Sequence, residues 1–330
     1  MDFITEMKTK AQQQKRSVVF PESDDDRILN TCKTLLEEGI AQPILIGESH
    51  VIKSRADEIG LDLAGIEVFD NRDQGLIDEL SADYDYSCGL SENAAKRLLK
   101  EPVYFAARMV KLGRADTMVA GLRYTTGEVV LASQSMIGME EGIQTPSSLF
   151  LMRIPDYDGP EGEYLIFADG GVCPSPTPEE LADIAKMTAR TAKRLLGWGP
   201  RVAMISFSTK GSAVHPAVDH VLEALRIARE CDPELLIDGE LQVDAAIVPE
   251  VAARKVEESS SVAGRANILI FPDLDAANAA YKLVQRLAKA DAYGPFLQGF
   301  AKSVSDLSRG STVEDIIGVV AMTIARTIER

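Results

Sequence analysis

The sequence has few residues of the kinds that build metal and disulfide sites. Its 330 residues include four cysteines and three histidines. The histidines do not form a metal set, because His215 and His220 are five residues apart rather than the three or four that place two ligands on one helix face. The cysteines have no CxxC spacing, and we interpret them as free thiols in a reducing cytosol; they are Cys32, Cys88, Cys173 and Cys231.

Long apolar runs and an excess of positive charge are also missing. No run approaches the roughly 18 apolar residues of a membrane-spanning helix, and the N-terminal segment lacks the apolar core of an export signal. We therefore expect a cytoplasmic protein. The formal net charge is −16, from 51 acidic and 35 basic residues. Because nucleic acids and anionic membranes attract basic surfaces, we expect neither as a partner.

What the sequence does contain is an alternation of short β-branched runs with longer amphipathic stretches. This pattern is typical of an α/β fold in which helices flank mainly parallel sheets. A chain of this length indicates two domains. In the first part we expect strands at 17–20, 44–46, 67–69 and 117–120, and helices at 25–38, 51–59, 91–99 and 102–111. Gly39, Gly60 and Gly113 stand where helix-ending glycines belong.

The middle of the chain predicts a hairpin followed by a long helix. Turn-forming residues at 153–162 separate expected strands at 149–152 and 164–168. Thr177-Pro-Glu-Glu then starts a helix that runs to Leu196, with proline at its first position and acids in its first turn. Further strands are expected at 202–207, 235–238 and 268–271.

The most informative stretch is Asp306-Leu-Ser-Arg-Gly-Ser-Thr-Val-Glu-Asp315, which places a Ser-Arg-Gly turn before an apolar helical run at 316–328. Two pairs have capping-box spacing there, Ser311 with Glu314 and Thr312 with Asp315. Such a turn directs free backbone N–H groups and a positive helix end toward whatever lies in front of it.

Three side chains in the same stretch provide functional groups at this turn. Arg309 supplies a forked cation, Ser308 a hydroxyl and Asp315 a potential base. The stretch is therefore a candidate anion site. The alternative is a capped helix whose Arg309 pairs with a surface acid.

Two further segments carry polar residues in positions that favour binding. The loop 206–212, with Ser208 and Lys210, stands between a strand and a helix, where it forms either an anion-binding loop or a structural turn. Asn278, Tyr281, Lys282 and Arg286 fall on one helix face, which is either a binding face or a solvated charged one.

Several motifs in a fixed order carry a resemblance to a known family. They closely resemble the phosphate acetyltransferase and phosphate butyryltransferase family, with the acetyl enzymes the nearer match, from Val18 to the C-terminus. Besides the Ser-Arg-Gly stretch, the motifs are residues 18–29, 202–212, 238–246, 249–255, 268–275, 278–288 and 293–300.

The resemblance implies two α/β domains with the substrate cleft between them, one near 1–143 plus 297–330 and the other near 144–296. It implies transfer of an acyl group between phosphate and coenzyme A, with coenzyme A as a substrate, no cofactor, no covalent acyl-enzyme, and a homodimer. The family's general base corresponds to Asp315, and Ser308 and Arg309 occupy positions that hydrogen-bond the charge on the acyl phosphate. Arg286 corresponds to a family arginine implicated in coenzyme A binding. The other candidate substrate-binding residues are Asn278, Lys282, Thr126, Arg123, Ser208 and Lys210.

The sequence departs from the family at two arginines. Leu131 stands where the family motif Thr-x-x-Thr-x-Arg-Pro-Ala has an arginine, and Ser81 replaces a second family arginine. Each charge-assisted contact is worth roughly 1.5–3 kcal/mol, so this loss leaves a degenerate, non-catalytic acyl-CoA-binding protein as an alternative. Arg123, on the loop that leads to Leu131, is the candidate replacement cation. The acyl group, whether acetyl, propionyl or butyryl, stays open.

Overall fold

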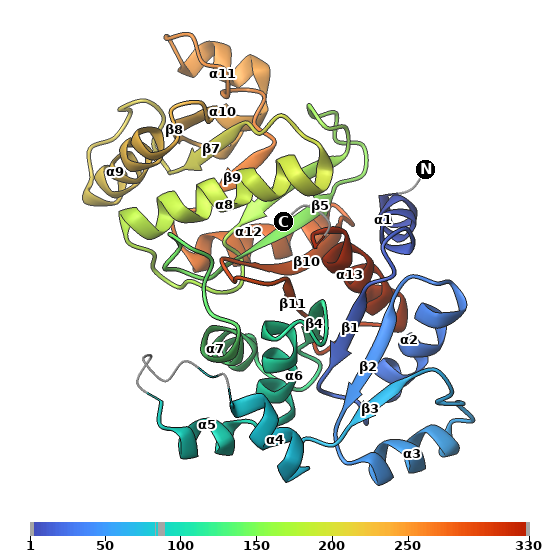
Figure 1. Cartoon of the computed structure of the whole chain (residues 1–330). Helices are drawn as coiled ribbons and strands as arrows, with labels where there is room; N and C mark the ends of the chain where they lie inside the picture. The colour runs from blue at the N-terminus through green and yellow to red at the C-terminus, as the bar shows by residue number, and fades with distance from the viewer. Residues whose placement is uncertain (1–2, 83, 85–89, 328–330) are drawn as a thin grey trace. The chain divides into compact units, whose positions relative to one another are not determined.

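The computed structural model describes residues 3–82, 84 and 90–327, and its helices and strands are drawn in Figure 1. The chain forms two compact units, residues 1–141 with 300–330 (unit 1) and residues 142–299 (unit 2). Both units combine helices with a sheet, so the predicted α/β class is confirmed. Cys88 and residue 328, the expected end of the last helix, lie outside the described residues.

Unit 1 is built on a parallel sheet with the strand order β3-β2-β1-β4-β11. The four strands expected in the first part of the chain are confirmed. Apolar runs form β1, β2 and β4 because parallel strands are covered on both faces. The strands are β1 (Ser17–Phe20), β2 (Gln42–Ile46), β3 (Glu67–Phe69), β4 (Thr117–Ala120) and β11 (Val304–Asp306).

Helices cover both faces of this sheet. One face carries α1 (Phe3–Gln12), α2 (Asp26–Glu37) and α13 (Val313–Ala325), and the other carries α6 (Pro102–Lys111) and α7 (Thr126–Met136). All residues of α13 from 316 to 325 are buried, which explains its nearly continuous apolar sequence. The other helices described in this unit are α3 (Ser49–Glu58), α4 (Gln74–Ser81) and α5 (Glu92–Leu98). The predicted helix-ending glycines have left-handed backbones, with φ of +64° at Gly39, +69° at Gly60 and +74° at Gly113.

The loops that follow the strands of unit 1 share one edge of the sheet, because all of these strands are parallel. The chain adds β2 and β3 on one side of β1, and then places β4 on the other side. The loops after β1 and β4 therefore flank a topological switch point, the position where open α/β sheets bind ligands. The loop after β11 emerges beside the loop after β4.

Unit 2 has a mixed sheet with the strand order β10-β5-β6-β9-β7-β8. The predicted hairpin is confirmed, since β5 and β6 pair antiparallel. The predicted long helix is also confirmed: α8 (Pro178–Leu196) begins with a capping box between Thr177 and Glu180. The strands are β5 (Ser147–Arg153), β6 (Tyr164–Ala168), β7 (Val202–Ile205), β8 (Ile237–Leu241), β9 (Ile268–Ile270) and β10 (Asp291–Gln298).

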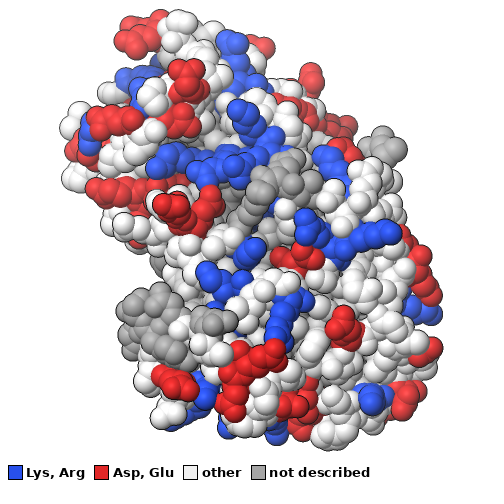
Figure 2. Space-filling view, viewed as in Figure 1, with Lys and Arg blue, Asp and Glu red and all other residues white. Residues whose placement is uncertain are grey.

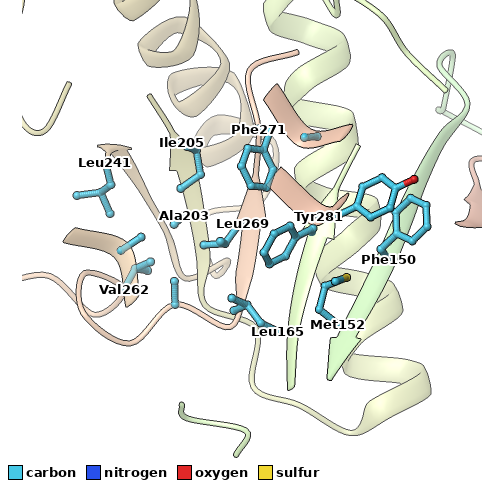
Figure 3. Packing of buried hydrophobic residues seen from close by; sticks show 14 of the residues in the cluster. Phe150, Met152, Leu165, Ala203, Ile205, Leu241, Val262, Leu269, Phe271 and Tyr281 are labelled. Carbon is cyan, nitrogen blue, oxygen red and sulfur yellow. The ribbon is translucent and has the colours of Figure 1, made fainter. Parts of the chain in front are cut away.

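Helices again lie on both faces of the unit 2 sheet. One face is covered by α8 and α9 (Pro216–Cys231), and the other by α10 (Val243–Ile247) and α12 (Leu274–Leu287), while α11 (Pro249–Lys255) packs on α10. Figure 3 shows the core beneath α10 and α12. There the ring of Tyr281 stacks on Phe150 with centroids 4.1 Å apart. This stack fixes the position of α12 on its sheet and thereby the position of the polar face that the helix exposes.

Two further observations concern the charge on the surface and the length and polarity of the helices. Acidic and basic side chains are interspersed over the face drawn in Figure 2, so on that face the negative net charge is not one unbroken acidic surface. Within the described part of the chain, every helix is too short or too polar to cross a membrane.

Candidate active site

A buried carboxylate organises the switch point of unit 1. Glu22 follows β1, is 3% exposed, and accepts hydrogen bonds from four successive backbone N–H groups after β4. Its Oε2 accepts from Gly121 at 2.8 Å and from Leu122 at 3.0 Å, and its Oε1 accepts from Arg123 and from Tyr124, the latter at 2.9 Å. This single side chain holds the whole loop between β4 and α7 in place.

A second buried carboxyl lies at the end of β11. Asp306 is 2% exposed, and its Oδ2 lies 2.5 Å from Oγ1 of Thr126, the first residue of α7. Its Oδ1 is buried without a hydrogen-bond partner among the described residues. Gly121 packs directly against it, since a Cβ at that position would lie 2.2 Å from Oδ1 on a backbone with φ of +120°. Only glycine fits there.

The Ser-Arg-Gly turn begins two residues later and is held by an arginine of α2. The Nη1 atom of Arg27 donates to the carbonyl of Arg309 at 2.8 Å and to that of Ser311 at 3.1 Å. The other edge of the same guanidinium is fixed by Asp25, the N-cap of α2. The turn is thus anchored through its backbone, which leaves its side chains for other contacts. Both Ser308 and Arg309 are exposed.

The guanidinium of Arg309 makes no hydrogen bond or ion pair with any residue that the structure describes, so the expected alternative of a surface ion pair is not observed there. Its charge nonetheless reaches the first turn of α7 and the end of β11. The pKa of Glu128 is lowered, mainly by hydrogen bonds from Thr125 and also by Arg309. The positive charge of Arg309 therefore acts on the first turn of α7, an arrangement that favours anions.

The helix after the turn begins with the second of the two possible capping boxes. Thr312 is the N-cap, and Oδ2 of Asp315 accepts from its N–H at 2.9 Å and its hydroxyl at 3.0 Å. Asp315 is exposed, and no described residue donates a hydrogen bond to its Oδ1. One oxygen of this carboxylate therefore caps the helix, and the other is accessible to a ligand.

Arg123 lies close to the same edge but already has a partner. It forms an ion pair with Asp24, with Nη1 3.0 Å from Oδ2. Both side chains line a pocket of about 410 Å³ at the carboxyl ends of β1, β2 and β4, which also has Arg72 and Tyr124 in its wall. A small ligand in this pocket would meet Arg123 only in competition with Asp24.

The two positions where the family has arginines differ in exposure. Leu131 lies on α7 and is 54% exposed, so an apolar side chain faces solvent there. Ser81 is 2% exposed and donates its hydroxyl to the carbonyl of Asp78 at 3.0 Å. The substitution at 131 leaves a surface position without its charge, whereas the one at 81 forms part of the packed interior.

The loop after β7 in unit 2 uses its candidate binding groups internally. The hydroxyl of Ser208 donates to Glu240 at 2.7 Å, and Nζ of Lys210 lies 2.5 Å from Asp238 and 2.9 Å from the carbonyl of Gly239. These contacts favour the structural interpretation of this loop, and a substrate-binding role for Ser208 and Lys210 stays a prediction.

The three candidates on α12 are arranged differently. Asn278 donates to the carbonyl of Gly170 at 3.1 Å, so it links the helix to the loop after β6. Lys282 and Arg286 are exposed. Lys282 lies 4.9 Å from the ring centroid of Tyr281, and Arg286 makes no ion pair within the part of the chain that the structure describes. Two cations on this helix are therefore available to an anionic ligand.

Sequence reasoning assigned no role to Glu22, Arg27 or Asp306, which hold the site of unit 1 together. Glu22 and Arg27 lie in the motif after the first strand, and Asp306 is the first residue of the Ser-Arg-Gly stretch. A signal was present, since charged residues directly after parallel strands meet at one edge of the sheet. Within the described residues, no three His, Cys, Asp or Glu side chains are grouped as metal ligands would be.

Comparison with known proteins agrees with this geometry. A family model described as phosphate acetyl/butaryl transferase matches residues 2–324. The chain belongs to this family. Phosphate acetyltransferase of Clostridium acetobutylicum is 43% identical over 330 residues, 99% of this chain and 98% of the relative. That of Thermoanaerobacterium thermosaccharolyticum is 44% identical over 326 residues, 98% of each chain.

A solved structure extends the family agreement to the fold. The phosphotransacetylase from Streptococcus pyogenes superimposes with a TM-score of 0.93 at 37% identity, and the match covers 100% of both chains. The resemblance inferred from the motifs is confirmed.

Proposed function

We propose that this chain is a phosphate acyltransferase that interconverts acetyl-CoA plus phosphate and acetyl phosphate plus coenzyme A. The observation that carries the proposal is the exposed guanidinium of Arg309, unpaired among the described residues, on the turn that leads into the helix of Asp315. Membership of the phosphate acetyl/butaryl transferase family supports the same activity. A cation next to a base is what transfer of an acyl group from phosphate to a thiol requires.

The proposed reaction proceeds in a ternary complex, without an acyl-enzyme. Asp315 takes the proton of the coenzyme A thiol, since a thiol of ordinary pKa is mostly protonated at neutral pH. The thiolate attacks the carbonyl carbon of acetyl phosphate. The C–O bond to phosphate then breaks, and phosphate leaves with the electron pair. Arg309 and Ser308 hydrogen-bond the negative charge that develops on the oxygens.

For coenzyme A we propose contacts with the exposed face of α12. Arg286 and Lys282 are cations without an acidic partner in the described chain, and they suit the phosphate groups of coenzyme A. Asn278 lies on the same face, closer to the loop after β6. Thr126, at the start of α7, is proposed to bind the phosphate-bearing substrate. Coenzyme A is thus a substrate, and the proposal includes neither a metal nor a cofactor.

We also propose that Arg123 replaces the charge of the missing arginines. Replacement of Arg123 by alanine is expected to raise the KM for acetyl phosphate more than that for coenzyme A. Replacement of Asp24 by asparagine is expected to lower the KM for acetyl phosphate, because it releases the Arg123 guanidinium from its ion pair. Each shift should be about 3- to 10-fold, as for one charge-assisted contact partly screened by water.

Initial rates at varied acetyl phosphate and fixed coenzyme A measure these shifts. Arg226, a surface arginine paired with Glu223 and Glu230, provides the control Arg226→Ala, for which no change is expected. Unchanged acetyl phosphate kinetics in both Arg123→Ala and Asp24→Asn would show that Arg123 is not the replacement cation.

A second candidate function is favoured by Leu131 and Ser81, namely a regulatory acyl-CoA-binding protein without turnover. A substrate panel separates the two candidates and also identifies the acyl group. Purified protein is mixed with coenzyme A and acetyl, propionyl or butyryl phosphate, and thioester absorbance is recorded. We expect turnover, fastest with acetyl phosphate. Coenzyme A binding with no turnover on any of the three would instead support the regulatory candidate.

We also propose that the protein is a homodimer in the cytoplasm. Reduced cysteines support the location, since Cys32, Cys173 and Cys231 are free thiols. The dimer follows from the family resemblance.

A further inference from the structure

The hydroxyl of Thr126 has a buried carboxyl as its neighbour. Asp306 is the last residue of β11 and Thr126 is the first residue of α7. Their side-chain oxygens are 2.5 Å apart. Thr126 is only partly buried, and its neighbours Thr125 and Gly127 at the start of α7 are exposed. A hydroxyl has a single proton to donate. That proton points either at Asp306 or at a ligand.

The packing around Asp306 leaves its Oδ1 without a hydrogen-bond partner among the described residues. Gly121 lies against its Oδ1, and a Cβ at that glycine would also lie 2.6 Å from the backbone nitrogen of Leu307. The charged groups that act on Asp306 are Glu22 after β1, which is also negative, and Arg309 on the Ser-Arg-Gly turn. In this confined place the carboxyl responds to its surroundings by changing its protonation rather than its position.

We propose that Asp306 is a positioning residue that sets the direction of the Thr126 hydrogen bond toward the phosphate-bearing substrate. When Asp306 is neutral, its proton is donated to Oγ1 of Thr126, and the Thr126 hydroxyl proton is free to donate to the anion. When Asp306 is ionised, Thr126 donates to its Oδ2 and presents only lone pairs to the anion. The inference rests on the proposed function, because the anion is the phosphate group of that reaction.

The two states exchange in an accessible pH range. Burial raises the pKa of Asp306 to about 7, and the charge of Glu22 adds to this rise, while the hydrogen bonds from Thr126 and Leu307 and the charge of Arg309 oppose it. A raised pKa means that the neutral form predominates below about pH 7. Anion binding through Thr126 is therefore strongest on the acid side of this value and weakens as the pH rises through it.

Binding of sulfate, measured by calorimetry between pH 6 and pH 8.5, tests the inference without reliance on turnover. Sulfate is a tetrahedral dianion with no proton to lose in this range, so any pH dependence belongs to the protein. For the unmodified chain we expect the affinity to fall by about tenfold, the size of one hydrogen bond to a charged group.

Three variants separate positioning from a merely structural role. Asp306→Asn has nearly the same shape, and its amide donates to Thr126 at every pH, so sulfate binding should stay tight and lose its pH dependence. Thr126→Val should bind weakly and equally at all pH values. Thr126→Ser keeps the hydroxyl and should retain the pH response. Thermal melting at pH 6 and pH 8 confirms that each variant is folded, and if Asp306→Asn does not fold, the two Thr126 variants decide.

Sulfate binding that does not change with pH in the unmodified chain would overturn the inference, and so would a full pH response in Thr126→Val. A failure of the proposed function is recognised separately, by the absence of thioester formation from acetyl phosphate and coenzyme A. In that case a pH response that depends on Asp306 and Thr126 would still support the positioning role toward a tetrahedral anion.

Discussion

Replacement of Asp315 by asparagine is expected to lower kcat by about 10²–10⁴-fold while the affinity for coenzyme A stays nearly unchanged. The amide has almost the same shape as the carboxylate, and its oxygen can still accept the hydrogen bonds from Thr312 that cap α13. What it cannot do is take the proton of the thiol. Steady-state rates together with calorimetric titration of coenzyme A measure both quantities.

Asp315 both caps α13 and is the proposed base, so a control is needed that removes the cap and keeps the base. Thr312→Ala is that control. It should lower the free energy of unfolding by about 1 kcal/mol, as loss of an N-cap does, but change kcat by only a few-fold. If Thr312→Ala loses as much activity as Asp315→Asn, the carboxylate acts through the helix cap and not as the base.

Arg309→Ala is expected to lower kcat/KM by about 10²–10³-fold, the effect of removing one donor from a developing negative charge. Arg309→Lys should recover only part of the loss, because an ammonium cannot reproduce the two parallel hydrogen bonds of a guanidinium. Stability should hardly change in either variant, since the side chain is exposed and unpaired in the described chain.

Full recovery by lysine would contradict the inference of a two-pronged contact and show that charge alone matters. Arg226→Ala again serves as a control for the loss of a surface arginine. A large loss of stability in Arg309→Ala would also contradict the account, because it would assign Arg309 to the architecture of the turn.

The parts of the structure that sequence patterns predicted are those set by neighbours along the chain. The strand at 17–20, the helix at 102–111 and the start of α8 at Thr177 follow from apolar periodicity, proline position and capping chemistry. The strand β10 was not predicted, because Gly294-Pro295 interrupts its run. The structure accommodates this pair at a register shift between Tyr293 and Phe296.

The candidate site shows the same division between local and distant determinants. The Ser-Arg-Gly turn and the helix after it could be predicted from one stretch of sequence. The choice between two capping boxes offset by one residue could not, since both have the required spacing. The partners of Glu22 and Arg27 could not be predicted from either stretch alone, because Glu22 binds a loop about 100 residues away and Arg27 binds a turn more than 280 residues away.

Because two family arginines are missing, one measurement tests most directly the central claim that this chain is an active phosphate acyltransferase. Thioester formation from acetyl phosphate and coenzyme A is compared between the unmodified chain and a variant that carries Leu131→Arg together with Ser81→Arg. We predict ready turnover by the unmodified chain, since Arg309, Ser308 and Asp315 are present and Arg123 supplies further charge. No turnover by the unmodified chain, with activity created by the two arginines, would contradict it and identify the protein as a degenerate member of its family.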